Sequence, residues 1–204
     1  MDSTGQLFVL SGPSGVGKSS LRTGVRERFP ELAYSVSYTT RAPRQGESEG
    51  RDYHFVSLET FLAMKEAGAF VECAQVHGNY YGTSRAQLEK HLNDRRDLLL
   101  EIDVQGARQV KEHFPRACFI FVLPPDRETL KKRLSERGTE QGGDVEARLD
   151  NASRELGEAS WYDYLIINDV LEEAVEALAA IILSTRCRRQ AVLPRVLNLL
   201  QPPE

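Results

Sequence analysis

The stretch from residue 12 to residue 19, GPSGVGKS, matches G-x-x-x-x-G-K-[ST] at every required position. Glycines let such a backbone turn its N–H groups toward one anion, and a following helix adds partial positive charge at the same point. Lys18 would reach the β- and γ-phosphates, and the Ser19 hydroxyl would ligate Mg²⁺. The candidate nucleotide-binding residues are Gly12, Pro13, Ser14, Gly15, Val16, Gly17, Lys18, Ser19 and the adjoining Ser20. The sequence therefore predicts a nucleoside triphosphate site.

The segments on either side of this phosphate loop favour that interpretation over a Gly/Ser-rich turn that matches by chance. Leu7–Leu10 is a short apolar run typical of a buried parallel strand. After the loop, Leu21, Val25 and Phe29 recur at helical spacing, which predicts a helix over 19–29. A strand before the loop and a helix after it are the context that phosphate binding requires.

Two carboxylates follow the apolar run Leu98-Leu99-Leu100, in the order Glu101-Ile102-Asp103. Carboxylates at the C-terminal end of a parallel strand lie on the edge where α/β folds bind ligands. Next to a phosphate loop, such a carboxylate can hold Mg²⁺ directly or through water. The alternative is a carboxylate that only caps the turn after the strand.

A polar segment, residues 39–53, carries Arg41, Arg44 and Arg51 and ends in Tyr53. Its composition is that of a solvated surface loop, which is the default interpretation. Three arginines so close together, followed by a tyrosine, can also form an anion-binding clamp, because guanidinium groups bind phosphate oxygens in a bidentate way. Both interpretations remain open from composition alone.

A charged helix pair is expected over 126–137 and 145–156, joined by a glycine-rich loop over 138–144. Such charges by default solvate a helix face. If Arg133, Arg137 and Arg148 all point into one cleft, however, the pair would act as a mobile lid.

The remaining periodicity predicts alternating strands and helices. Strands are expected over 33–38, 54–56, 70–76, 117–123 and 164–167, and a turn-rich aromatic segment over 78–84. Helices are expected from a Ser57 cap to Ala67, from a Ser84–Gln87 capping box to Leu92, and over 106–114 and 171–183. The tail from Cys187 to Glu204 permits only a short helix.

Composition limits the partners and the compartment. The 204 residues carry a net charge of −4, so no overall basic field would hold a nucleic acid. Cys73, Cys118 and Cys187 form an odd set with no zinc-ligand spacing, which favours a reducing compartment over a disulfide framework. The first strand leaves no room for a signal peptide, and the run 178–183 is too short to cross a bilayer. We therefore expect a cytoplasmic protein without a membrane partner.

A longer pattern gives a family resemblance. The run T-T-R-x-x-R-x-x-E-x-x-G-x-x-Y-x-F-V, over 39–56, resembles the signature of the guanylate kinases without a gap. The phosphate loop GPSGVGKS, the segment GNYYGT over 78–83, the strand end EIDVQG over 101–106 and the run RLSERGTE over 133–140 are similar to that family too. The resemblance covers residues 6–185 and leaves the tail outside.

The resemblance implies the fold and its division. We expect an α/β protein with the three-layer P-loop NTPase fold, which has a central parallel sheet, an inserted mixed α/β GMP-binding lobe and a helical lid. The whole chain, 1–204, would be a single guanylate-kinase-like domain. Its core would comprise 1–37, 86–127 and 158–204, the GMP-binding lobe 38–85, and the lid 128–157.

The resemblance also implies roles for individual residues. The GMP phosphate would be held by Arg41, Arg44, Tyr53 and Tyr81, with Ser37 nearby, and the guanine edge would be read by Glu72, Thr83 and Asp103. The transferring phosphoryl group would be stabilised by Lys18, Arg133, Arg137 and Arg148, and Asn168 would lie near the adenine of ATP. The metal ligands would be Ser19 and Glu101, although the family position of Glu101 is often Asp.

The expected activity is ATP:GMP phosphotransfer, which yields ADP and GDP in purine nucleotide metabolism, with Mg²⁺ as cofactor and ATP and GMP as small-molecule partners. One alternative is a guanylate-kinase-like scaffold that binds phosphopeptides without catalysis; such modules typically have a damaged phosphate loop, whereas Lys18 and Ser19 are present here. Another is a kinase of the same fold that acts on a different phosphorylated acceptor. The apolar part of the tail could serve a homo-oligomer interface.

Overall fold

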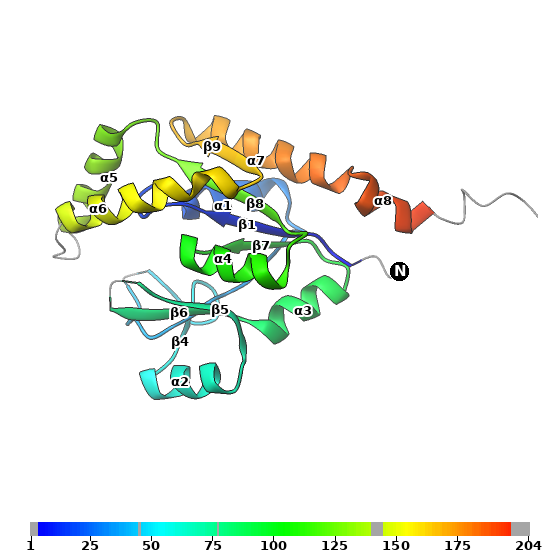
Figure 1. Cartoon of the computed structure of the whole chain (residues 1–204), viewed down its shortest axis with the longest axis horizontal. Helices are drawn as coiled ribbons and strands as arrows, with labels where there is room; N and C mark the ends of the chain where they lie inside the picture. The colour runs from blue at the N-terminus through cyan, green and yellow to red at the C-terminus, as the bar shows by residue number, and fades with distance from the viewer. Residues whose placement is uncertain (1–3, 45, 77, 140–144, 197–204) are drawn as a thin grey trace, which may run out of the picture.

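The computed structural model describes residues 4–44, 46–76, 78–139 and 145–196 (Figure 1). Its elements fall into two sheets with helices around them. The predicted glycine-rich loop and the end of the tail fall largely outside the described residues.

The central sheet has five parallel strands in the order β2-β7-β1-β8-β9. These strands are β1 (Leu7–Ser11), β2 (Ala33–Tyr34), β7 (Leu98–Glu101), β8 (Cys118–Leu123) and β9 (Tyr164–Ile167). In β1 and β7 the register pairs Leu10 with Glu101, so the carboxylate predicted from the sequence ends beside the start of the phosphate loop. The expected site residues thus share the C-terminal edge of this sheet.

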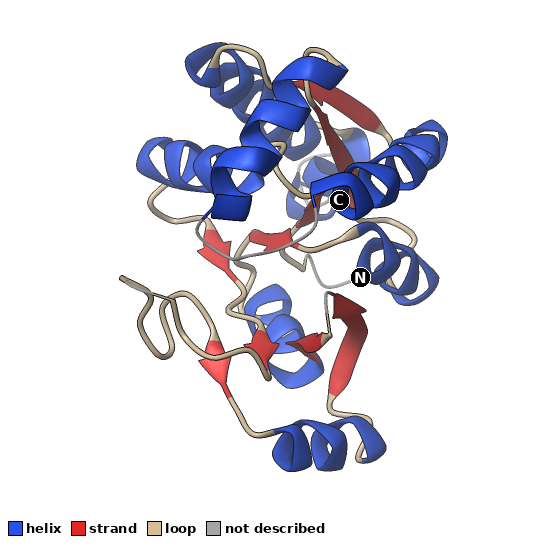
Figure 2. Ribbon diagram, turned by 90° about the vertical axis from the view of Figure 1, so that its left-hand side faces the viewer, coloured by secondary structure: helices blue, strands red, loops and turns tan. Residues whose placement is uncertain are grey.

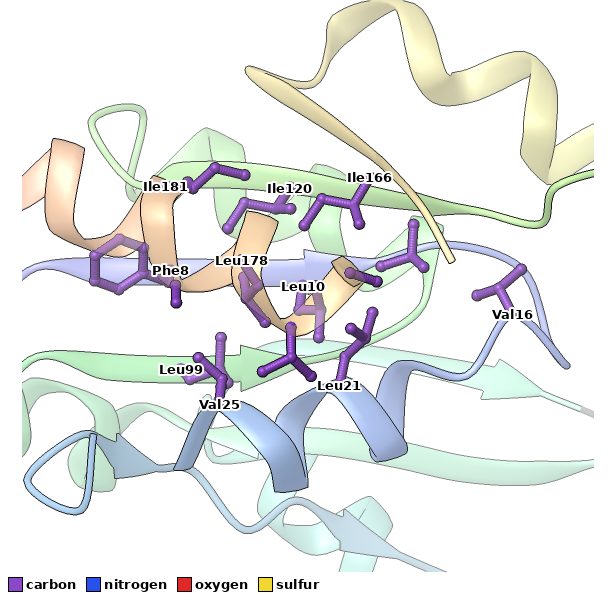
Figure 3. Close-up of a cluster of buried hydrophobic side chains, with 14 of the residues drawn as sticks. Phe8, Leu10, Val16, Leu21, Val25, Leu99, Ile120, Ile166, Leu178 and Ile181 are labelled. Carbon is purple, nitrogen blue, oxygen red and sulfur yellow. The ribbon is translucent and has the colours of Figure 1, made fainter. Parts of the chain in front are cut away.

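Alternating apolar residues bury both faces of the central sheet, which makes the fold three-layered. Phe8 and Leu10 of β1 pack on one side with α1 (Lys18–Arg28) and α7 (Leu171–Arg186), as Figure 3 shows. Leu7 and Val9 pack on the other side with α3 (Arg85–Asn93) and α4 (Val104–His113). Strands buried on both faces appear in a sequence as continuous apolar runs, so these strands could be predicted from the sequence.

The second sheet has four short strands in the order β4-β3-β6-β5 and pairs them both parallel and antiparallel. Its strands are β3 (Tyr38–Thr39), β4 (His54–Phe55), β5 (Phe70–Val76) and β6 (Asn79–Ser84), and helix α2 (Leu58–Glu66) lies beyond it. Both views show this sheet and α2 on one side of the molecule and the central sheet on the other (Figures 1 and 2).

Two sequence predictions in this region were wrong. The single strand expected over 33–38 is two strands, because Ala33 and Tyr34 pair with β7 whereas Tyr38 pairs with β6 of the second sheet. The segment expected as a turn is strand β6 from Asn79 onward, paired along its length with β5. Strand pairing with a distant segment overrides local turn propensity.

The helix caps follow the sequence more closely. The Ser57 hydroxyl accepts from the Thr60 N–H at 3.1 Å, and the Ser84 hydroxyl from the Gln87 N–H at 3.4 Å. The Gln87 side chain lies 3.5 Å from His54 Nε2. Of the capping box predicted over Ser84–Gln87, the structure therefore shows the hydrogen bond to the serine. Helix α4 begins two residues earlier than predicted because Asp103 caps it, accepting from the Gly106 N–H at 2.7 Å.

The charged helix pair consists of α5 (Arg127–Thr139) and α6 (Val145–Leu156), which pack against each other and lead into a 3₁₀ helix over Gly157–Trp161. A short α8 (Arg189–Val196) follows α7. Among the described residues, no helix combines the length and the apolar composition needed to span a membrane.

Candidate active site

A cavity of about 650 Å³ lies between the phosphate loop, α6 and the second sheet. Its lining includes Gly12, Pro13, Ser14, Gly15, Gly17, Lys18 and Ser19 from the loop, and Ser37, Arg44, Tyr53, Glu72, Tyr81, Glu101, Asp103 and Arg148 among the other predicted residues. Val16, buried in the core, and Thr83, buried beneath Glu72, are outside the lining. Residues far apart in the sequence therefore surround one cavity.

The phosphate loop is held in shape by its own lysine and by the end of β9. Lys18 Nζ donates to the Gly12 carbonyl oxygen at 2.6 Å and to the Pro13 carbonyl oxygen at 3.0 Å. Asn168 Nδ2, directly after β9, donates to the Val16 carbonyl oxygen at 2.7 Å. Gly17 has φ 88°, and a Cβ there would lie 2.3 Å from Asn168 Nδ2, so both conformation and space require glycine.

Ser19 and Glu101 form the pair predicted for the metal. The Ser19 hydroxyl donates to Glu101 Oε1 at 2.7 Å, which joins α1 to the end of β7. Mg²⁺ in phosphate-loop proteins takes few protein ligands and keeps several waters, and hydroxyl and carboxylate oxygens are the hard donors it prefers. These two residues therefore fit the ion. Among the described residues no group of three or more His, Cys, Asp and Glu side chains could hold a metal without the nucleotide.

Arg22 is a cavity-lining residue that the sequence analysis missed. Its Nη1 lies 3.4 Å from Glu101 Oε2 and donates to the Tyr34 hydroxyl at 2.7 Å, and its guanidinium lies 4.5 Å from the centre of the Tyr34 ring. Desolvation together with the nearby Glu101 charge raises the pKa of Tyr34 above its ordinary value. The only signal in the sequence was the four-residue spacing from Lys18, which puts both cations on one helix face.

The same cavity has a second group of polar residues, which we call the base-end set: Glu72 and Asp103 in its wall, and Thr83 hydrogen-bonded to Glu72. Glu72 is 4% exposed, and its Oε1 accepts from the Thr83 hydroxyl at 2.6 Å. Burial raises the pKa of Glu72 to about 7, and the Asp103 carboxylate nearby acts in the same direction. Burial also raises the pKa of Asp103, against the lowering effect of its Gly106 hydrogen bond. Asp103 therefore caps α4 and lines the cavity at once.

The predicted phosphate clamp is only partly at the cavity wall. Arg44, Tyr53 and Tyr81 line it, whereas Arg41 is absent from the lining. Arg41 Nη2 donates to both carboxylate oxygens of Glu47 at 2.9 Å, and its guanidinium lies 5.4 Å from the centre of the Tyr53 ring. Arg41 thus contacts the residues that form the wall.

The arginines of the helix pair do not all reach one cleft, which corrects the prediction from sequence. Arg148 of α6 lines the cavity described above, where its Nη2 lies 3.5 Å from the Ser14 hydroxyl. Arg133 of α5 lines a second cavity of about 330 Å³ and donates to the Asn168 carbonyl oxygen at 3.0 Å. The two helices pack against each other, yet these two arginines line different cavities. The Arg137 side chain lies outside what the structure describes.

The two cavities meet at the phosphate loop, because Gly15 and Gly17 line both. The second cavity also contains Ser20 and Asn168, two of the predicted ATP-binding residues. One loop with a separate cavity on each side suits a reaction that brings two ligands together at a phosphate.

Comparison with known proteins identifies the family. A sequence profile of the family described as guanylate kinase matches residues 4–185. The guanylate kinase of Syntrophotalea carbinolica is 49% identical over 192 residues, which cover 94% of this chain and 91% of that protein. The guanylate kinase of Geobacter metallireducens is 45% identical over 196 residues, which cover 96% of this chain and 97% of that protein.

A solved structure gives the same result. The crystal structure of guanylate kinase from Anaplasma phagocytophilum superimposes with a TM-score of 0.75 and 34% sequence identity, and covers 96% of this chain and 97% of that one. The family profile, the curated relatives and the solved structure all extend over nearly the whole chain, including the phosphate loop and the base-end set. The chain therefore belongs to the guanylate kinase family.

Proposed function

We propose that this protein transfers the γ-phosphate of ATP to GMP and releases ADP and GDP, with Mg²⁺ bound to the phosphates of ATP. The loop, Lys18 and Ser19 would bind the triphosphate, and the second cavity beside Asn168 and Arg133 would receive the adenosine. The larger cavity would receive GMP, with its phosphate near Arg44, Tyr53 and Tyr81 and its base at the base-end set.

The observation that carries this proposal is that the cavity beside the phosphate loop is also lined by the two carboxylates of the base-end set. Guanine presents an N1–H and a 2-amino group on one edge, and both are donors that a carboxylate accepts. Adenine has an unprotonated N1 there, so its lone pair would face the carboxylate. A buried polar group left without a partner strongly disfavours the wrong ligand.

Phosphoryl transfer requires little covalent chemistry from the protein. Its residues align the two nucleotides and stabilise charge on the equatorial phosphate oxygens, and we assign that work to Lys18, Arg133, Arg137 and Arg148. The acceptor is itself a phosphate oxygen, anionic at neutral pH, so no strong general base is needed. When bound, Mg²⁺ would neutralise charge on the β- and γ-phosphates, with Ser19 and Glu101 as the residues that hold it.

The division of the chain follows from the same proposal. Residues 38–85 would form the GMP-binding lobe and 128–157 the lid, within one domain. Closing the lid would exclude water, so that the γ-phosphate reaches GMP rather than being hydrolysed. A cytoplasmic location is supported by the three cysteines, all of which are free thiols. A homo-oligomer would use the apolar part of the tail.

A nucleotide panel tests the proposal. ADP release from the purified full chain would be measured with ATP, Mg²⁺ and each of GMP, AMP, UMP and CMP, and again with a chelator in place of Mg²⁺. We expect rapid release with GMP alone and its loss with the chelator. Equal release with all four monophosphates, or faster release with another one, would contradict GMP as the acceptor. No release with any of them would favour the phosphopeptide-binding scaffold.

A further inference from the structure

Strand β5, which carries Glu72, is the outermost strand of the second sheet, so within the described part of the chain no strand pairs with one of its edges. That edge faces helix α4, as the contacts between α4 and β5 and Figure 1 show. The position of Glu72 relative to Asp103 therefore depends on how β5 is held against α4.

Gln109 of α4 makes that connection through both backbone groups of one β5 residue. Its Nε2 donates to the Cys73 carbonyl oxygen at 2.9 Å, and its Oε1 accepts from the Cys73 N–H at 3.0 Å. A side-chain amide has one donor and one acceptor side, like a peptide group, so Gln109 takes the place of the neighbouring strand that β5 lacks. Cys73 adjoins Glu72, the buried carboxylate of the base-end set.

A second contact from the same helix lies one turn earlier. A Cβ added to Gly106 would lie 2.6 Å from Glu72 Oε2, so the absence of a side chain lets the carboxylate rest against α4. Asp103, Gly106 and Gln109 are three residues apart and lie along one side of the helix. On that side of α4, Asp103 is itself a member of the base-end set and Gly106 contacts Glu72. Gln109, also on that side, binds β5, the strand that carries Glu72.

We propose that Gln109 is a positioning residue for base recognition: by binding both backbone groups of Cys73 it fixes β5, and with it the Glu72 carboxylate, at the distance from Asp103 that guanine requires. The inference rests on the proposed function, in which Glu72 and Asp103 read the guanine edge. Gln109 itself is absent from the residues that line the cavity. It therefore acts on the substrate only through β5.

The test replaces Gln109 with Met, which keeps the length of the side chain and removes both hydrogen bonds. We expect the GMP KM to rise about tenfold, the loss expected for two neutral hydrogen bonds, with kcat changed less than about twofold. The ATP KM and the weak activity on AMP should stay unchanged, so the GMP-to-AMP ratio of kcat/KM should fall by the same factor. Glu112→Met, at an exposed position on the same helix, is the matched control.

Amide hydrogen exchange supplies a readout independent of catalysis. The Cys73 N–H should exchange faster in Gln109→Met, while the amides of the central strand β1 keep their protection. Gln109→Asn, one methylene shorter, is the second variant if the first does not fold. A folded variant with an unchanged GMP-to-AMP ratio would overturn the inference, as would failure of both variants to fold, since Gln109 would then serve the whole fold.

The same experiment separates this inference from the proposed function. If the wild-type protein shows no preference for GMP, the proposed function fails and the inference fails with it. If the wild-type protein prefers GMP and Gln109→Met keeps that preference, only the inference fails.

Discussion

The phosphate loop and the base-end set lie in one cavity but are built in opposite ways. The loop is one continuous stretch held largely by its own residues, through Lys18 bonding to the carbonyl oxygens of Gly12 and Pro13, with one long-range hydrogen bond from Asn168. The base-end set comes from β5, β6 and the N-terminus of α4, three elements that meet only in the folded chain. The loop offers backbone donors and cations to an anion, whereas the base-end set offers the buried Glu72 carboxylate and the half-buried Asp103 carboxylate to neutral donors.

The two regions also differ in how they affect the stability of the fold. A half-exposed cation that bonds to nearby carbonyl groups is partly compensated before any ligand arrives. Glu72 is buried, its hydrogen bond comes from a neutral hydroxyl, and the neighbouring Asp103 carboxylate has the same sign. Placing a carboxylate there costs stability, and the guanine edge would supply the missing donors. Four changes test that contrast, in order of decreasing effect.

The largest effect is expected at the loop. Lys18→Ala should lower kcat by about three orders of magnitude, because the lysine acts on charge that is redistributed in the transition state. GMP affinity, measured by calorimetry, should change less than about threefold, since the base-end set is untouched. Lys90→Ala, at an exposed position of α3, is the control. A Lys18→Ala enzyme that keeps kcat within about tenfold of the wild type would remove the lysine from the catalytic machinery.

The next effect concerns the choice of base. Glu72→Gln should lower kcat/KM for GMP by about two to three orders of magnitude, because the amide presents one donor where guanine needs acceptors. The weak activity on AMP should barely change, so the ratio between the two nucleotides should shrink. The exposed Glu59→Gln on α2 is the matched control. An unchanged GMP-to-AMP ratio would mean that Glu72 does not read the base.

The same substitution should show the stability cost of the buried carboxylate. Because burial raises the pKa of Glu72 to about 7, the folded protein holds this proton more tightly than the unfolded chain, whose value is near 4.5. The stability contributed by the protonated Glu72 side chain is therefore fully present below about pH 4.5 and is lost as the pH rises through about 7. Without ligand, the unfolding free energy of Glu72→Gln should therefore increase relative to that of the wild type as the pH rises from about 4.5 to above about 7. The difference should reach about 3 kcal/mol when Glu72 is fully deprotonated.

Denaturant unfolding of the two proteins at about pH 5 and about pH 8.5 measures this difference. Only the difference between the two proteins is informative, because every other titrating group is common to both. If the two unfolding free energies change in parallel with pH, the Glu72 carboxylate is not destabilised by its surroundings.

The smallest effect is expected at Arg22, which acts on the loop side of the contrast. Arg22→Met would remove a cation that competes with the metal for the Glu101 carboxylate, so less Mg²⁺ should be needed for half-maximal rate, by about threefold to tenfold. The GMP KM should change less, because the Arg22 guanidinium is paired with Tyr34 and Glu101 and not with the residues of the phosphate clamp. Arg22→Lys keeps the charge, so its Mg²⁺ concentration for half-maximal rate should lie between the values of the wild type and Arg22→Met. An unchanged Mg²⁺ titration together with a raised GMP KM would place Arg22 with the acceptor instead.

Local patterns were sufficient for much of the fold. The strand, loop and helix around the phosphate loop, the apolar central strands and the serine caps at Ser57 and Ser84 match the predictions. Each depends on a few consecutive residues, through hydrophobic period, glycine content or a hydroxyl at a helix start. The strand expected over 33–38 and the turn expected over 78–84 failed because strand pairing with distant segments decided both.

By itself the sequence determined the phosphate loop, because eight consecutive residues carry both its conformation and its chemistry. It also named the base-end set, but only through a family resemblance; from its own pattern Glu72 is an acidic residue on a strand. The tertiary structure alone decided that Glu72 is buried beside Asp103, that Arg133 and Arg148 line different cavities, and that Gln109 holds β5. The physical reason is distance along the chain: desolvation and long-range hydrogen bonds depend on what packs around a residue, and its sequence neighbours do not specify that.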